Sequence, residues 1–202
     1  MHEERYYNEL KDYIVNEVQI PSQVLLKKTI SNKNKALSIA TKVAIQMSVK
    51  VGNAVWEIER SHKFFKDRIV LSGGLSISKN KKHYTLGFVG TINTKSTEIF
   101  SRFKGNIKEK EKIGKQVFFD IYYEWLNNFM KQKNEPTLPH MIMIYREGLS
   151  DSQLQIQLHP EIEALNDAVE KIREEKKLVR RPSIVYMTVN KKIDTRFFAR
   201  FK

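Results

Sequence analysis

Glu147 stands where a carboxylate can take part in chemistry. It follows the apolar run 141–145, which predicts a short buried strand, and it precedes a glycine. Ser150 and Asp151 come next as a helix N-cap, and the helix they begin carries apolar residues at helical spacing, namely Leu154, Leu158 and Ile162. Open α/β sheets place ligands and metals between a strand's carboxyl end and a helix N-terminus. The spacing therefore predicts a metal or ligand site at Glu147.

A second group of polar side chains is suited to binding phosphate. Tyr7 and Lys11 lie four residues apart on one predicted helix, and Gln46 and Lys50 lie four apart on another, so each pair shares a helix face. Gln23 lies between the two helices in the sequence. If the five side chains converge, the lysines supply positive charge, and the tyrosine and the amides supply oriented hydrogen bonds. The alternative is that each is an ordinary solvent-facing polar residue.

The charge balance favours a polyanionic partner. The chain of 202 residues has 36 Lys and Arg against 23 Asp and Glu, a net charge of +13. Because each phosphate neutralised by these side chains releases counterions, nucleic acid is the preferred partner. The alternative is a lysine-rich composition that only solvates the surface.

Composition also indicates the cellular compartment. No apolar run is long enough to span a bilayer, and the basic residues do not form one amphipathic helix, so a membrane partner is not expected. The N-terminus lacks the apolar segment of a signal peptide. The chain has no cysteine, which excludes disulfides and thiolate metal sites and is compatible with a reducing compartment. We expect a cytoplasmic or nuclear protein.

The hydrophobic pattern divides the chain into two parts, residues 1–62 and 63–202. In the first part it predicts a helix at 3–16, a short strand at 23–28 and an amphipathic helix that ends at Gly52. In the second part it predicts strands at 68–75, 84–92, 98–103, 141–145 and 183–189, helices at 108–131 and 151–177, and the start of a strand at 195–201. The turn at 76–82 is too short for the crossover of a doubly wound parallel sheet. We therefore expect an α/β fold with a mixed sheet, three antiparallel strands followed by β-α-β-α-β, flanked by helices.

Several stretches of the chain together resemble one known family. Tyr145–Gln153 reads YREGLSDSQ, close to the pattern Y-R-D-G-V-S-x-x-Q. Matching stretches elsewhere are Pro21–Val24, Thr41–Lys50, Gly87–Val89 and Asp194–Phe198. They resemble the Piwi domain of the Argonaute/Piwi family, in particular its Piwi subfamily. The resemblance implies the C-terminal part of a MID-like domain and the MID–Piwi junction for residues 1–62, and a partial, RNase H-like Piwi domain for residues 63–202.

The resemblance also assigns a role to the phosphate-binding candidates. In the Piwi subfamily the matching positions bind the 5′-phosphate of the guide RNA. The positions here are Tyr7, Lys11, Gln23, Gln46 and Lys50, all of which carry the residue of the family pattern. The resemblance therefore implies an intact site for the 5′-end of a guide.

A basic stretch near the C-terminus is a further candidate. Lys191, Lys192 and Arg196 match a K-K-x-x-x-T-R-F-F stretch that lies near nucleic acid in the family. The resemblance implies contacts with the sugar-phosphate backbone, which position a strand without reading its sequence. The alternative is a solvated turn.

The nuclease site of the family is less well preserved. The family holds Mg²⁺ with Asp, Glu, Asp and a fourth His or Asp, and the matching text puts Gly73 at the first position. Glu111 matches the second, although residues 108–115 also read as a solvated start of a helix. Glu147 matches the third with one extra methylene, and the fourth would lie beyond Phe198. Glu111 and Glu147 are the catalytic candidates, Glu147 is the metal candidate, and efficient cleavage is not expected.

Together with the charge, the resemblance implies an RNA-binding Piwi-domain protein that anchors the 5′-phosphate of a small guide RNA in RNA silencing and is deficient in cleavage. Its expected partners are a single-stranded guide RNA, a complementary target RNA and a protein that covers an exposed sheet edge. Mg²⁺ is compatible with this function but is not required for binding. The alternatives are a Mg²⁺-dependent guide-directed RNA endonuclease and a non-functional truncated copy.

Overall fold

The computed structural model describes most of the chain in two compact units, Met1–Glu57 and Ile58–Lys202. The described residues are 2–31, 33–57, 59, 68–80, 82–108, 113–132, 136–149, 154–190 and 196–199. The expected boundary between residues 62 and 63 lies outside the described residues and stays a prediction. No described helix is long and apolar enough to cross a membrane.

The first unit is helical. Its elements are α1 (His2–Asp12), the π-helix η1 (Tyr13–Val18), α2 (Lys27–Ile30), the 3-10 helix η2 (Lys33–Lys35) and α3 (Ala36–Lys50). The predicted helix at 3–16 is confirmed, since α1 continues directly into η1. The predicted strand at 23–28 is wrong, because residues 23–26 have no regular structure and α2 begins at Lys27. A strand needs a neighbour to pair with, and the described part of this unit contains none.

Helix α3 confirms the predicted amphipathic helix but not the burial of its apolar face. Gly52 follows the helix with a φ of +94°, and its N–H donates to the carbonyl of Val49 at 3.0 Å. Leu37 and Met47, two residues of the apolar face, are 83% and 52% exposed. Within the described residues of this unit no side chain is classed as buried. The unit therefore presents apolar surface that its own described residues do not cover.

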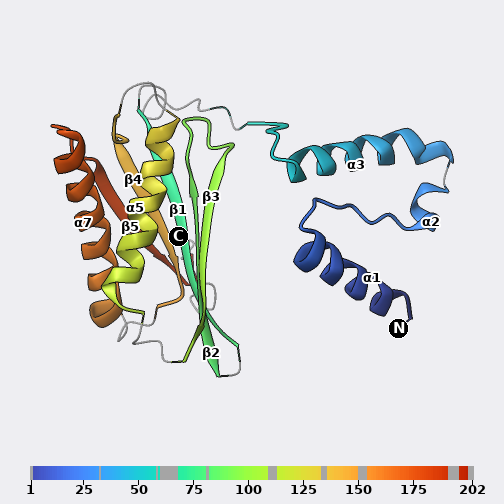
Figure 1. Cartoon of the computed structure of the whole chain (residues 1–202), viewed down its shortest axis with the longest axis horizontal. Helices are drawn as coiled ribbons and strands as arrows, with labels where there is room; N and C mark the ends of the chain where they lie inside the picture. The colour runs from blue at the N-terminus through green and yellow to red at the C-terminus, as the bar shows by residue number, and fades with distance from the viewer. Residues whose placement is uncertain are drawn as a thin grey trace. The chain divides into compact units, whose positions relative to one another are not determined.

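The second unit is built on a five-stranded mixed sheet in the order β3-β2-β1-β4-β5 (Figure 1). The strands are β1 (Val70–Asn80), β2 (His83–Thr91), β3 (Ile99–Ile107), β4 (Met141–Glu147) and β5 (Ser183–Val189). β1, β2 and β3 pair antiparallel, whereas β4 is parallel to β1 on one side and to β5 on the other. The predicted α/β class and mixed sheet are confirmed.

The predicted bounds of two strands are wrong by the largest margin, and β3 also runs to Ile107 where the prediction ended at 103. The turn expected at 76–82 is mostly strand, because β1 continues to Asn80 and stays paired with β2 from Ser76↔Gly87 to Asn80↔His83. Short polar residues are tolerated there because one face of the hairpin meets solvent. The strand expected to start near residue 195 is absent from the described residues 196–199, which have no regular structure.

Two long helices cover one face of the sheet. They are α5 (Lys115–Lys131) and α7 (His159–Lys176), which lie side by side, and the π-helix η4 (Leu154–Leu158) leads into α7 (Figure 1). The helices expected at 108–131 and 151–177 are confirmed over these bounds. The first begins later than expected, because the described residues 108, 113 and 114 are not helical.

Aromatic packing joins α5 to β2. Trp125 is fully buried, and its Nε1–H donates to the carbonyl of Thr91 at 2.9 Å. The ring of Phe88 meets those of Tyr122 and Trp125 edge-on, with centroids 5.5 and 5.0 Å away. The core of the unit therefore lies between this sheet face and the two helices, and it fixes which residues of each strand point to the opposite face.

Candidate nucleic-acid interface

The two lysines predicted to bind phosphate converge on Ser22. Lys11 Nζ donates to the Ser22 carbonyl at 3.2 Å and to Ser22 Oγ at 2.6 Å. Lys50 Nζ donates to the same carbonyl at 2.6 Å and to Gln23 Oε1 at 2.6 Å. The structure thus brings together three of the five predicted residues, Lys11, Gln23 and Lys50.

Local structure explains this convergence. Lys11 is in the last turn of α1, after which the chain reverses through Gln19, whose φ is +57°. The extended segment that follows returns Ser22 to the end of α1, and the last turn of α3 supplies Lys50. Lys50 is at the C-terminus of α3, where the macrodipole stabilises a cation, whereas α1 continues beyond Lys11 into η1. The positive charge of the site therefore comes from the two ammonium groups and not from a helix N-terminus.

Electrostatics make this cluster, which we call the Ser22 cluster (Lys11, Ser22, Gln23 and Lys50), suited to an anion. Two like charges on one oxygen repel each other, and neither lysine has a carboxylate partner among the described residues. Each ammonium has three N–H donors and uses two of them here, so one donor remains on each. A phosphate placed against both would accept those donors and offset the repulsion.

The other two candidates lie on the same helix faces without entering the contacts. Tyr7 is one turn before Lys11 and is 48% exposed, and Gln46 is one turn before Lys50 and is also exposed. Neither side chain makes a hydrogen bond to another described residue. Their role in binding phosphate stays a prediction.

The remaining predicted contacts lie mostly outside the described residues. Lys191, Lys192 and Glu111 are among the positions that the structure does not describe. Arg196 is described and exposed, on a segment without regular structure. Their roles also stay predictions.

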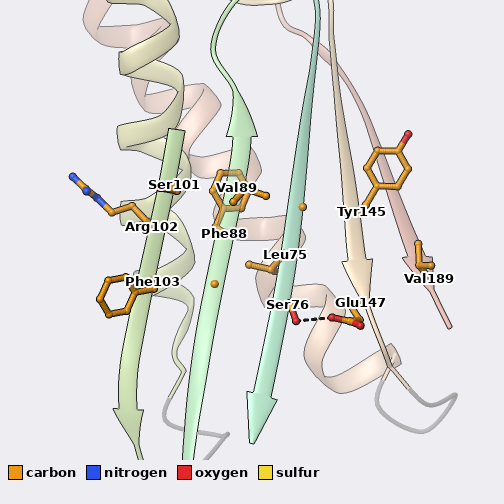
Figure 2. Close-up of a pocket in the computed structure, with 12 residues that line it drawn as sticks. Leu75, Ser76, Phe88, Val89, Ser101, Arg102, Phe103, Tyr145, Glu147 and Val189 are labelled. Atoms are coloured by element: carbon orange, nitrogen blue, oxygen red, sulfur yellow. Dashed lines mark hydrogen bonds between the residues drawn. The ribbon is translucent and has the colours of Figure 1, made fainter. Parts of the chain in front are cut away.

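Glu147 lies at the end of β4 on the sheet face that α5 and α7 leave open (Figure 2). Its Oε2 accepts a hydrogen bond of 2.7 Å from Ser76 Oγ of β1. The two residues line a pocket of about 610 Å³ on this face. The pocket's other lining residues are Gly74, Leu75, Gly87, Phe88, Val89, Ser101, Arg102, Phe103, Tyr145 and Val189.

The strand register changes which glycine faces Glu147. A Cβ at Gly73 would lie 2.9 Å from both Ile144 Cδ1 and Phe88, so a side chain there would point into the core. A Cβ at Gly74 would lie 3.5 Å from Val89 Cγ2, on the open face. Of the two glycines, the one that lies on the face of Glu147 is therefore Gly74, one position after the residue that the sequence pattern indicates.

The described donors around Glu147 do not fit a magnesium ion. Mg²⁺ in RNA-cleaving sites is held by several carboxylates, and among the described residues that line the pocket Glu147 is the single acid. No group of three or more metal-binding acids or imidazoles occurs anywhere in the described residues. The walls of the pocket beside Glu147 are formed largely by glycine, valine and aromatic residues.

A buried polar network, which the sequence reasoning missed, holds the end of β4. Arg146 and Glu161 are each 1% exposed and form an ion pair in which Nε lies 2.9 Å from Glu161 Oε2. Arg146 Nη1 also donates to the carbonyl of Glu147 at 2.5 Å. Tyr186 donates to Glu161 Oε2 at 2.7 Å, and its hydroxyl lies 3.3 Å from that of Tyr122. The network thereby fixes the backbone that carries the Glu147 side chain.

Burial raises the pKa of both tyrosine hydroxyls well above its usual value, and nearby Glu161 raises both further. Both therefore remain protonated and act as donors. The alternation along β4 contains the missing signal, since Arg146 is in phase with the apolar residues Ile142 and Ile144 and must face the helices with them.

The chain consists of a helical unit followed by a mixed α/β sheet with two long helices on one face. The Piwi domain family matches residues 2–202, and the chain belongs to this family. It is 30% identical over 195 residues to Piwi-like protein 1 of Gallus gallus, covering 96% of this chain and 21% of that protein. It is also 30% identical over 196 residues to Protein argonaute-3 of Drosophila melanogaster, covering 96% and 20%. The chain thus spans about a fifth of the length of these relatives.

Solved structures agree on the fold. The Kluyveromyces polysporus Argonaute with a guide RNA superimposes with a TM-score of 0.72 at 17% identity, over 93% of this chain and 21% of that chain. The MID-PIWI domains of the N. crassa QDE-2 AGO superimpose with a TM-score of 0.65 at 20% identity, over 80% and 46%. These likenesses establish the Argonaute Piwi, RNase H-like architecture that the sequence predicted.

Proposed function

We propose that this chain binds the 5′-phosphate of a small single-stranded guide RNA through the Ser22 cluster and does not cleave the paired target. The observation that carries the proposal is the convergence of Lys11 and Lys50 on one carbonyl oxygen, with no carboxylate partner for either among the described residues. A terminal phosphate carries more negative charge than an internal phosphodiester, so the cluster favours a 5′-phosphorylated end. Tyr7, Gln23 and Gln46 would add hydrogen bonds to it.

Membership of the Piwi family supports RNA as the ligand. The name of one structural neighbour states that it holds a guide RNA, and that protein shares the fold of this chain. The net charge of +13 gives the chain the electrostatic attraction that any RNA requires. We also propose a complementary target RNA as the second partner, because a bound guide can pair with it.

The test compares RNAs that differ only in their 5′-end. Fluorescence anisotropy should show the full chain binding a 5′-phosphorylated RNA more tightly than the same RNA with a 5′-hydroxyl. Lys11→Ala or Lys50→Ala should abolish that difference, whereas Lys28→Ala, which removes an exposed charge of α2, should leave it in place. Equal binding of the two RNAs by the unaltered chain would contradict the proposal and favour the non-functional copy.

The proposed lack of cleavage rests on the donors near Glu147. Incubation of the loaded chain with a matched target and Mg²⁺ or Mn²⁺ should leave the target intact. Cleavage that is lost in Glu147→Ala would establish the endonuclease instead. Gly74→Asp is a gain-of-function variant for the same test. It places a second carboxylate on the open face, where the new side chain has only ordinary contact with Val89. The Gly73→Asp variant is its control, since that side chain would enter the core.

A protein partner on the sheet is proposed as well. Phe103 of the edge strand β3 and Val89 of β2 are 80% and 52% exposed on the open face. An edge strand also presents unpaired backbone groups to solvent. A partner of this kind should reduce hydrogen exchange in β3.

A further inference from the structure

Three residues gather at the edge of the sheet opposite Glu147. Arg68 precedes β1, His140 precedes β4 and Arg180 precedes β5. The three strands are parallel and adjacent, with Val70 opposite Met141 and Met141 opposite Ser183, so their N-terminal ends share one edge. The lead-in residues of the strands therefore meet, although they are far apart in the chain.

The imidazole of His140 is held rigidly in this edge. The backbone N–H of His140 donates to the carbonyl of Ile69 at 2.8 Å, and its carbonyl accepts from the N–H of Ser183 at 3.0 Å. The N–H of Ile69 donates to ring atom Nδ1 at 3.1 Å. On the other side of the ring, Arg180 Nη1 lies 2.6 Å from Nε2.

These contacts leave one donor too many. A neutral imidazole has one acceptor nitrogen and one N–H, yet a donor approaches each of its two nitrogens. If Nδ1 accepts from the N–H of Ile69, the ring proton lies on Nε2. In that tautomer the Nε2–H and the guanidinium of Arg180 are neighbouring donors, and an oxygen anion beside them can accept from both.

The protonation state of the His140 ring agrees with this count of hydrogen-bond donors and acceptors. Burial first, and then the charges of Arg180 and Arg68, lower the pKa of His140 below its ordinary value. The ring is therefore neutral at neutral pH, and only one of its two nitrogens can accept a hydrogen bond there.

The neighbouring Arg181 makes different contacts from those of Arg180. Arg181 Nε lies 3.0 Å from Glu170 Oε1, and its Nη2 donates to Asn166 Oδ1 at 2.9 Å, so Arg181 is bound to α7. Arg180 has no carboxylate partner among the described residues. Two consecutive arginines thus serve two purposes, and the second is a matched control for the first.

We infer that His140 and Arg180, with Arg68 beside them, form a second oxyanion site that binds an internal phosphodiester of the RNA. His140 Nε2–H and the guanidinium of Arg180 donate to the phosphate oxygens. The net charge of +13 favours a polyanion over an acidic peptide as the occupant. The inference rests on the proposed function for the class of polymer, but it needs no 5′-phosphate.

The test measures the affinity of the full chain for 5′-phosphorylated and 5′-hydroxyl RNA across a series of salt concentrations. Arg180→Gln should weaken binding of both RNAs by the same factor, and it should reduce the slope of log affinity against log salt by about 0.7, the value for one single-strand phosphate contact. Arg181→Gln removes the same charge one residue away and should lower thermal stability while keeping the slope. His140→Asn should weaken both RNAs as Arg180→Gln does.

The outcomes separate this site from the Ser22 cluster. Loss of 5′-phosphate preference in Lys50→Ala with an unchanged salt slope in Arg180→Gln overturns the second site alone. A retained 5′-phosphate preference in Lys50→Ala with a reduced salt slope in Arg180→Gln overturns the 5′-phosphate proposal alone. Equal slopes for Arg180→Gln and Arg181→Gln overturn the second site, as does Arg180-dependent binding of a polyglutamate peptide that exceeds RNA binding. A pKa of His140, followed by NMR, that rises when 5′-hydroxyl RNA is added supports it, since a nearby anion favours the charged ring.

Discussion

Lys11 and Lys50 donate hydrogen bonds to the same atom, the carbonyl oxygen of Ser22, although they lie on separate helices. The contact holds the ends of α1 and α3 together through two cations and neutral acceptors. Such an arrangement is strained in the absence of an anion and relaxed in its presence. The stability of the first unit should therefore depend on the anions in solution.

We expect inorganic phosphate to protect the first unit against hydrogen exchange. A ligand that binds the folded state stabilises it by an amount that grows with its concentration, so amides at the ends of α1 and α3 should exchange more slowly in phosphate than in chloride at equal ionic strength. Lys11→Ala should abolish the difference, and Lys28→Ala should retain it. Equal exchange in the two salts would show that the cluster does not bind phosphate in the free chain.

The buried pair of Arg146 and Glu161 makes a second prediction, on stability. Glu161→Leu leaves the guanidinium buried without its carboxylate and should lower the free energy of unfolding by about 3–5 kcal/mol. The double variant Arg146→Met/Glu161→Leu should cost less than the sum of the two single variants, because no lone charge remains. Urea denaturation of the four proteins measures this coupling. Additive costs would mean that the two side chains stabilise the fold independently.

Two glycines on neighbouring strands predict opposite outcomes for the same substitution. A Cβ at Gly90 would lie 2.4 Å from Trp125 Nε1, whereas a Cβ at Gly74 would meet only Val89 at 3.5 Å. Gly90→Ala should therefore displace the indole from its hydrogen bond to Thr91 and lower the free energy of unfolding by about 1–3 kcal/mol. Gly74→Ala should leave stability nearly unchanged. Trp125 fluorescence during denaturation reports on both, and equal stability of the two variants would contradict the packing of the indole.

The sequence pattern predicted most helices and strands and the mixed sheet, but not the contacts between side chains. The strand Ser183–Val189 and the end of α3 just before Gly52 match expectation because both follow from alternation, helical spacing and a terminating glycine. The ion pair of Arg146 with Glu161 was not predicted, because its residues become neighbours only after β4 and α7 pack. For the site, the resemblance indicated that Lys11 and Lys50 bind one phosphate, but neither it nor the spacing indicates that Ser22 holds them. Likewise, register decides whether residue 73 or 74 faces Glu147, and a run of two glycines carries no signal for it.

The lowered pKa of His140 makes the stability of the folded chain depend on pH. Its pKa in the folded chain is lowered by burial and by Arg180 and Arg68, whereas the unfolded chain has the ordinary value of 6.5. Above 6.5 the ring is neutral in both states and its contribution to stability is fully present. As the pH falls below that value, the unfolded chain takes up the proton first, so stability is lost down to the lowered pKa of the folded state.

Urea denaturation at pH values on either side of 6.5 checks this dependence. His140→Asn should remove the part of the pH dependence that the ring supplies. Arg180→Gln should shrink it, because the folded pKa rises toward its ordinary value when the neighbouring charge is gone. Arg181→Gln is the matched control and should leave the dependence in place, since that guanidinium is bound to Glu170. A pH dependence that is the same in His140→Asn as in the unaltered chain would show that the ring does not titrate between the two states.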